Sequence, residues 1–102
     1  MLERGDICEL ISRRRRQILA HSVIYYMYNE SLISDNQWAE WASELYQLQI
    51  DHPYEAEVCP LHEPFKDFDP STGYNLPLDT PWAVRKAELL IKYHYENISG
   101  GK

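Results

Sequence analysis

Residues 18–55 read ILAHSVIYYMYNESLISDNQWAEWASELYQLQIDHPYE, and this stretch decides the fold. An apolar helical pattern ends at a polar connector, residues 29–33, and a second helical pattern follows it. Ser34 has the character of an N-cap, with Gln37 three residues later as in a capping box. The second helix is predicted over residues 35–50, because Asp51-His52-Pro53 should stop it. Since the connector is short, the two helices are expected to pack antiparallel as a hairpin.

The first helix of this hairpin is predicted over about residues 6–28, because apolar residues recur there at spacings of three, four and seven. Arg13, Arg14, Arg15 and Arg16 interrupt the pattern. Four consecutive arginines spread over a full turn, so at least one should lie near the buried face, paired with a carboxylate or with its aliphatic stem on the core. The run is either a solvated helix face or a set of candidate phosphate contacts, since guanidinium groups match phosphate oxygens.

Two tryptophans lie on the apolar stripe of the second helix, together with Ala42, Leu45 and Leu48. Residues at spacings of three and four share one helix face, so this stripe should face the core. We expect Trp38 to lie nearest the first helix and Trp41 nearest the last one. Tyr25, Ile24, Trp38 and Leu45 are expected to hold the hairpin together.

A last helix is predicted over residues 81–95, because Asp79-Thr80-Pro81 places a capping residue before a proline at the first helical position. Residues 53–80 hold five of the six prolines and are predicted to form a long irregular crossing. The crossing should be pinned by its own apolar side chains, which are Phe65, Phe68, Tyr74 and Leu76. The predicted architecture is all-α: a single domain over residues 1–102, three helices built on an antiparallel hairpin, with a long Pro-rich loop before the last helix.

Composition narrows the function classes. A hydrophobic content of 44% is typical of a folded chain, and a formal net charge of −6 argues against direct nucleic-acid binding. No apolar run approaches the roughly 18 to 20 residues that cross a bilayer, so no membrane association is expected. The sequence has no signal-peptide pattern at its start, which favours a cytoplasmic location. Cys8 and Cys59 are therefore expected to be reduced thiols.

The connector and the helices on either side of it resemble the small N-terminal helical domain, domain Ia, of bacterial NAD-dependent DNA ligases. The resemblance runs without a gap over about a third of the chain, and the matching residues are Tyr25-Tyr26, Ile33-Ser34-Asp35, Glu44-Leu45, Leu48 and His52-Pro53. In the ligases this domain grips the nicotinamide mononucleotide (NMN) half of NAD. The Asp69-Pro70-Ser71-Thr72 turn resembles a D-S-P-T turn of the ligases only loosely, and no function is carried over there.

The resemblance implies ligand-binding roles for Tyr25, Tyr26, Asp35 and Trp38. The first tyrosine of the ligase pair lies against the nicotinamide, and Tyr25 matches it. The family has an aspartate directly after the aromatic residue that Trp38 matches, and this chain has Ala39 there. Aromatic faces and carboxylates both attract a cationic nicotinamide ring, so the missing carboxylate weakens the match. The alternative is that Tyr25, Tyr26 and Trp38 only pack the two helices together.

No catalytic constellation is visible, and the chain is expected not to be an enzyme. Covalent adenylation by the ligases needs a lysine in a K-x-D-G context, which this sequence lacks. Cys59-Pro-Leu-His62 has zinc-like spacing, but one such pair without a second predicts no metal site. His21, four residues before Tyr25, belongs either to the same surface pocket or to an ordinary helix contact. No cofactor is expected, although NMN or NAD remains a candidate ligand.

Two functions stay open. The favoured one is a non-catalytic interaction or inhibitor protein on a domain Ia-like scaffold, acting on another protein such as a nucleic-acid enzyme or a bacterial defence nuclease. It accounts for the acidic charge and for Ala39, and the small detached domain suggests a phage or prophage origin in a bacterial or phage-infected cell. An acidic protein of this size is attracted to the basic grooves that hold DNA. The alternative is a stand-alone nucleotide-binding module for NMN or NAD.

Overall fold

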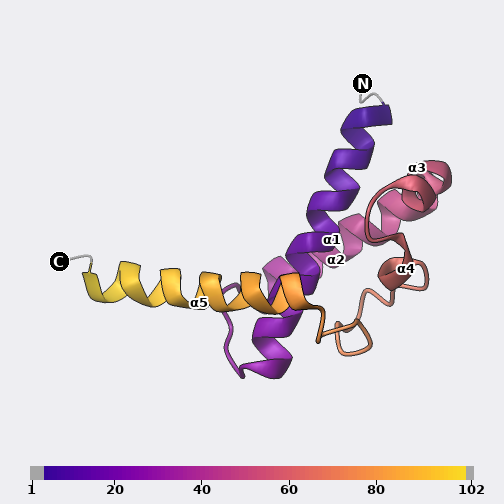
Figure 1. The fold of residues 1–102 in the computed structure, drawn as a ribbon. Helices are drawn as coiled ribbons and strands as arrows, with labels where there is room; N and C mark the ends of the chain where they lie inside the picture. Colours follow the sequence, from indigo (N-terminus) through magenta and orange to yellow (C-terminus); the bar gives the residue numbers. More distant parts are fainter. Residues whose placement is uncertain (1–3, 101–102) are drawn as a thin grey trace.

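The computed structural model describes residues 4–100, and the side chains of residues 5–96, as an all-α fold (Figure 1). Its helices are α1 (Arg4–Met27), α2 (Asp35–Asp51), α3 (Pro53–Val58), α4 (His62–Phe65) and α5 (Pro81–Gly100). The three long helices stand where the sequence predicts them, and no strand occurs among the described residues. The last helix runs further than the predicted residue 95.

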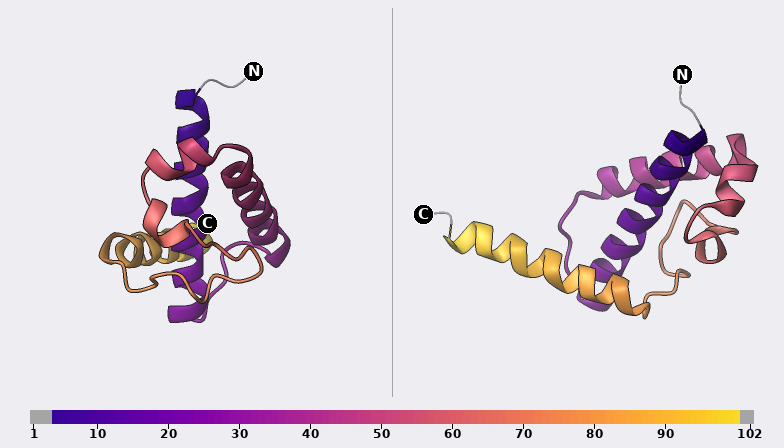
Figure 2. Two further views of the ribbon diagram at one scale, coloured as in Figure 1. Left: turned by 90° about the vertical axis from the view of Figure 1, so that its right-hand side faces the viewer. Right: turned by 45° about the horizontal axis from the view of Figure 1, so that its top comes forward.

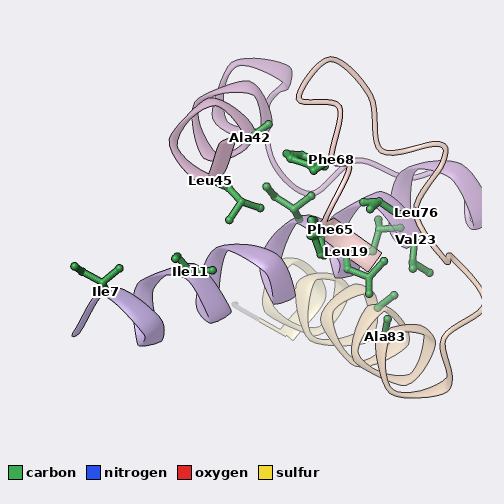
Figure 3. Packing of buried hydrophobic residues seen from close by; sticks show 13 residues of the cluster. Ile7, Ile11, Leu19, Val23, Ala42, Leu45, Phe65, Phe68, Leu76 and Ala83 are labelled. Carbon is green, nitrogen blue, oxygen red and sulfur yellow. The ribbon is translucent and has the colours of Figure 1, made fainter. Parts of the chain in front are cut away.

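The first helix lies at the centre of the fold, and α2, α3 and α5 all pack against it. Figure 3 shows side chains of α1 meeting those of α2, of α5 and of the segment around Phe65. The buried residues of α1 are Ile7, Ile11, Ser12, Arg15, Ile18, Leu19, Ala20, Ser22, Val23 and Ile24. Since neighbours cover α1 on several sides, its buried residues do not form a single stripe, and even polar positions are enclosed.

The second helix runs antiparallel to α1, as expected for a hairpin. Arg15 of α1 bonds to Gln49 near the end of α2, whereas Ser22, later in α1, lies beside Gly73 together with Trp38 from the start of α2. The side chain of Ser34 accepts a hydrogen bond of 3.0 Å from the Gln37 amide, which confirms the predicted N-cap.

The expectation for Trp41 was wrong. Its ring lies 5.6 Å from the His21 ring and 5.8 Å from the Arg14 guanidinium carbon, so it packs on α1 and not on the last helix. The reason is that α5 and α2 lie on opposite sides of α1, as the left view of Figure 2 shows. Tyr25 was expected to help hold the hairpin together, but its side chain is 54% exposed.

The segment 53–80 is more regular than predicted, because it contains α3 and α4. Pro53 both stops α2 and begins α3. Proline is tolerated at the first position of a helix because the N–H that it lacks would have no partner within the helix there. Phe65, Phe68 and Leu76 are buried and anchor this segment, as expected. Tyr74 is not an anchor, since it is 67% exposed.

The two cysteines are not reduced thiols, which corrects the expectation from the sequence. Cys8 and Cys59 form a disulfide with their Cα atoms 5.7 Å apart. The bond joins the first turns of α1 to the residue that follows α3, across 51 positions of sequence. Because α3 has only six residues, it depends on such tertiary links to stay in place.

Arg15 supplies a second link to the same region. Its fully buried guanidinium donates to the backbone oxygens of Ala56, Cys59 and Pro60 at 2.8 to 3.2 Å, and to Oε1 of Gln49 at 3.0 and 2.8 Å. These acceptors include carbonyls at the end of α3, which have no partner within the helix. Burial lowers the pKa of Arg15 to about 10, so the group stays charged at neutral pH. One arginine is buried as expected, but its partners are oxygens of amides and not a carboxylate.

The last helix gives the molecule an elongated outline of 45 × 29 × 25 Å. Its radius of gyration is 14.3 Å, against about 13 Å for an ordinary domain of this length. Figure 1 shows the second half of α5 extending away from α1. Two tyrosines fix α5 to the hairpin: Tyr28 donates to Glu88 at 2.7 Å, and Tyr95 donates to Glu30 at 2.9 Å. Among the described residues, no helix has both the length and the apolar character to span a bilayer.

Candidate functional site

A pocket of about 330 Å³ opens between the end of α1, the connector, the start of α2 and the turn at residues 70–72. Its lining residues are His21, Ser22, Tyr25, Tyr26, Ser31, Leu32, Ile33, Ser34, Asp35, Trp38, Ala39, Pro70, Ser71 and Thr72. The four residues singled out by the ligase resemblance, Tyr25, Tyr26, Asp35 and Trp38, are all among them. The volume lies at the small end of the roughly 300 to 1,000 Å³ typical of ligand pockets.

The chain reverses direction at the connector, which forms one wall of the pocket. Asn29 has a left-handed backbone with φ 56°, which asparagine adopts more readily than most residues. The Glu30 amide donates to the Ile24 carbonyl at 3.1 Å, which helps to close the end of α1. The Ser31 hydroxyl donates to the Ile33 carbonyl at 2.8 Å. These bonds turn the chain so that the Ser34 cap starts α2 beside the end of α1.

Two tyrosines form an aromatic edge beside the pocket. The rings of Tyr25 and Tyr26 meet edge to face at 4.9 Å, and those of Tyr26 and Tyr74 meet at 5.5 Å. Tyr25 is 54% exposed and Tyr26 is 37% exposed, and the contacts of Tyr26 beyond Tyr25 are with Thr72 and Tyr74 of the turn. Trp38, which is partly buried against the core, fits better the alternative interpretation of packing between the two helices.

The turn at residues 69–74 closes the other side of the pocket. The Ser71 amide and hydroxyl both donate to Oδ1 of Asp69, at 2.9 and 2.7 Å, and these bonds lower the pKa of Asp69. The hydroxyls of Thr72 and Tyr26 are 3.0 Å apart and hydrogen-bonded, which ties the turn to α1. A methyl group at Gly73 would collide with Ser22 and lie 3.2 Å from Cζ2 of Trp38, so only glycine allows this close approach.

The pocket offers negative charge and no permanent cation. Asp35 is the first residue of α2 and is exposed, and its carboxylate forms no hydrogen bond with the side chains the structure describes. None of the lining residues is Lys or Arg. Burial lowers the pKa of His21, so its ring is neutral near pH 7. These features suit a flat cationic or electron-poor ring better than a phosphate group.

The arginine run does not belong to this pocket. Arg15 is buried, and Arg14 is bound to Glu44 at 2.8 Å and to Gln17 at 2.7 Å. Arg13 pairs with Glu9 at 3.3 Å, and Arg16 is exposed. Arg14 lies seven residues before His21, which is about 10 Å along the helix axis at about 1.5 Å per residue. Phosphate contact by Arg15 is therefore ruled out by its burial, and the other three arginines do not line the pocket.

Two features of the pocket were not assigned from the sequence, the Ser22 hydroxyl and the turn at residues 70–72. The hydroxyl of Ser22 is buried and has no hydrogen-bond partner in the described structure. The residues Pro70, Ser71 and Thr72 were recognised as a turn, but without a role. Their turn chemistry was a usable signal, because an Asp-Pro-Ser-Thr sequence orders a loop by side-chain bonds to its own backbone.

Within the described part of the chain, no group of three or more His, Cys, Asp or Glu side chains gathers closely enough to hold a metal ion. The sulfur of Cys59 belongs to the disulfide, so the Cys59–His62 pair has lost its sulfur ligand. No protein-family model, curated protein or solved structure matches this chain.

Proposed function

We propose that the chain is a non-catalytic binding module whose pocket takes a small molecule with a flat, electron-poor ring, of which the nicotinamide of NMN is the model. The observation that carries the proposal is the convergence of Tyr25, Tyr26, Asp35 and Trp38 on one pocket. Tyr25 and Tyr26 are exposed there, and exposed aromatic residues beside a free carboxylate suit a cationic ring.

Affinity for NMN is expected to be weak. Ala39 lines the pocket where the ligases carry a second carboxylate, so a charge-assisted contact is missing. Such contacts contribute roughly 1.5 to 3 kcal/mol, which is at least about tenfold in affinity. We expect no NMN binding tighter than about millimolar.

Calorimetric titration of NMN, NAD and ADP-ribose tests the proposal. Ala39→Asp should strengthen NMN binding at least about tenfold. Ser43→Asp is the matched control, because Ser43 is exposed on the same helix one turn later and does not line the pocket. ADP-ribose, which lacks the nicotinamide, should not gain. Equal effects of the two substitutions, or no NMN binding even by Ala39→Asp, would reject the proposal.

A second candidate, the interaction or inhibitor protein, is supported by the distribution of charge. Residues 17–65 contain eight Asp and Glu residues and no Lys or Arg. Most of α2 and α3 therefore presents negative charge, which favours contact with a basic groove of a nucleic-acid enzyme or a defence nuclease. A pull-down from host lysate that recovers one such enzyme, and that high salt prevents, would favour this function.

A further inference from the structure

One side of α5 carries apolar side chains that the rest of the described chain leaves partly exposed. Trp82, Leu89 and Tyr93 are 38%, 56% and 66% exposed. Their spacings of seven and four place them on one side of the helix. Three exposed cations without an ion-pair partner among the described residues flank this stripe: Arg85, Lys86 and Lys92. We call these six residues the cationic face.

The exposed side chains of α2 and α3 carry the opposite charge. Tyr46, Ile50 and Val58 are 43%, 54% and 58% exposed, so this surface is also partly apolar. Three exposed carboxylates accompany them and form no ion pair within the described structure: Glu40, Asp51 and Glu57. We call these six residues the anionic face.

A single molecule cannot bring the two faces together, because α5 and α2 pack on opposite sides of α1 (Figure 2). The residues of the cationic face run from Trp82 to Tyr93 on α5, and those of the anionic face on α2 run from Glu40 to Asp51, so each set extends about 17 Å along its helix at about 1.5 Å per residue. Exposed apolar stripes flanked by complementary charges are the elements from which helices build specific contacts between chains.

We infer that the cationic face of α5 binds the anionic face of α2 and α3 on a second copy of this chain. The contact is heterologous, since two different surfaces meet, so it produces a closed ring or a chain of subunits depending on the rotation between copies. Burial of the apolar stripes supplies the attraction, and the charges fix which faces meet. The inference is independent of the proposed ligand, because neither face includes a residue that lines the pocket.

Charge reversal of each whole face tests this without knowledge of the register. One variant carries Arg85→Glu, Lys86→Glu and Lys92→Glu, and the other carries Glu40→Lys, Asp51→Lys and Glu57→Lys. Sedimentation velocity from micromolar to millimolar protein should show association of the unmodified chain. Each variant alone should associate at least about tenfold more weakly, because like charges then meet.

Mixing the two variants should restore the association, because the reversed α5 of one variant matches the reversed α2–α3 face of the other. Asp67→Lys, an exposed carboxylate outside both faces, is the control and should leave association unchanged. Circular dichroism checks that each variant keeps its helices. A monomeric unmodified chain at every concentration, or a mixture no more associated than its separate components, would overturn the inference. The first result would leave the anionic face free for the second candidate function.

Discussion

Replacement of Arg15 by Ala should destabilise the fold by about 3 kcal/mol or more, because it leaves several buried carbonyl oxygens without a donor, at about 1 to 3 kcal/mol for each unsatisfied group. Arg15 donates five hydrogen bonds of 2.8 to 3.2 Å, to three backbone carbonyls and to Gln49. At roughly 1.5 to 3 kcal/mol for each charge-assisted bond, the gross loss exceeds this figure. Burying the charged guanidinium costs several kcal/mol of desolvation free energy in the unmodified protein. The variant no longer has this cost, so the net loss of stability is smaller than the gross loss.

Urea unfolding followed by circular dichroism gives the free energy of unfolding by linear extrapolation. Arg16→Ala is the matched control, because Arg16 belongs to the same run but is exposed, and its loss should change stability by no more than about 0.5 kcal/mol. The loss of stability in Arg15→Lys should lie between the losses of the two alanine variants, since an ammonium group keeps the charge but cannot donate hydrogen bonds in the forked geometry of a guanidinium. Equal free energies of unfolding for Arg15→Ala and Arg16→Ala would show that the network around α3 does not stabilise the fold as described.

Three further changes have defined outcomes. Ser34→Ala should lower the free energy of unfolding by about 0.5 to 2 kcal/mol through loss of the Gln37 amide bond, and an unchanged urea midpoint would contradict this. Reduction of the disulfide, or Cys8→Ser, should cost about 4 kcal/mol by loop closure over its 51-residue separation, measured as the difference between unfolding curves with and without reductant. His21, whose pKa is lowered by burial, binds a proton more readily when unfolded, so stability should fall as pH drops below 6.5 and level off below the lowered pKa. His21→Gln should remove that part of the pH dependence, and an identical pH profile for the variant would refute the assignment.

Local signals in the sequence predicted most of the helical framework. Ser34 with Gln37 marked the start of α2, and Pro81 marked the start of α5, because caps and N1 prolines act through neighbouring residues alone. Pro53 was misleading, since one proline can end the expected helix and begin another. The resemblance to the ligase domain predicted that the four pocket residues lie together. The connector between the two helices, which brings them together, could be recognised from its own sequence.

What the sequence did not predict depends on contacts between distant segments. Nothing near Cys8 indicates that Cys59 approaches it, because that approach follows from where α3 is placed. The periodicity required one buried arginine but could not select Arg15, since the choice depends on the carbonyls of α3. Trp41 was assigned to the wrong neighbour for the same reason: a stripe on α2 shows that a face is buried, but not which helix covers it.

The binding proposal is tested most directly by ¹H–¹⁵N correlation spectra recorded during titration with NMN. The chain has three tryptophans, and each indole N–H gives a separate signal. Trp38 lines the pocket, whereas Trp82 lies on α5 and serves as an internal reference. The account predicts that the Trp38 indole and the amides of Tyr25, Tyr26 and Asp35 shift with NMN, while the Trp82 indole does not. Unchanged spectra at NMN concentrations well above millimolar, or shifts confined to α5, would contradict it.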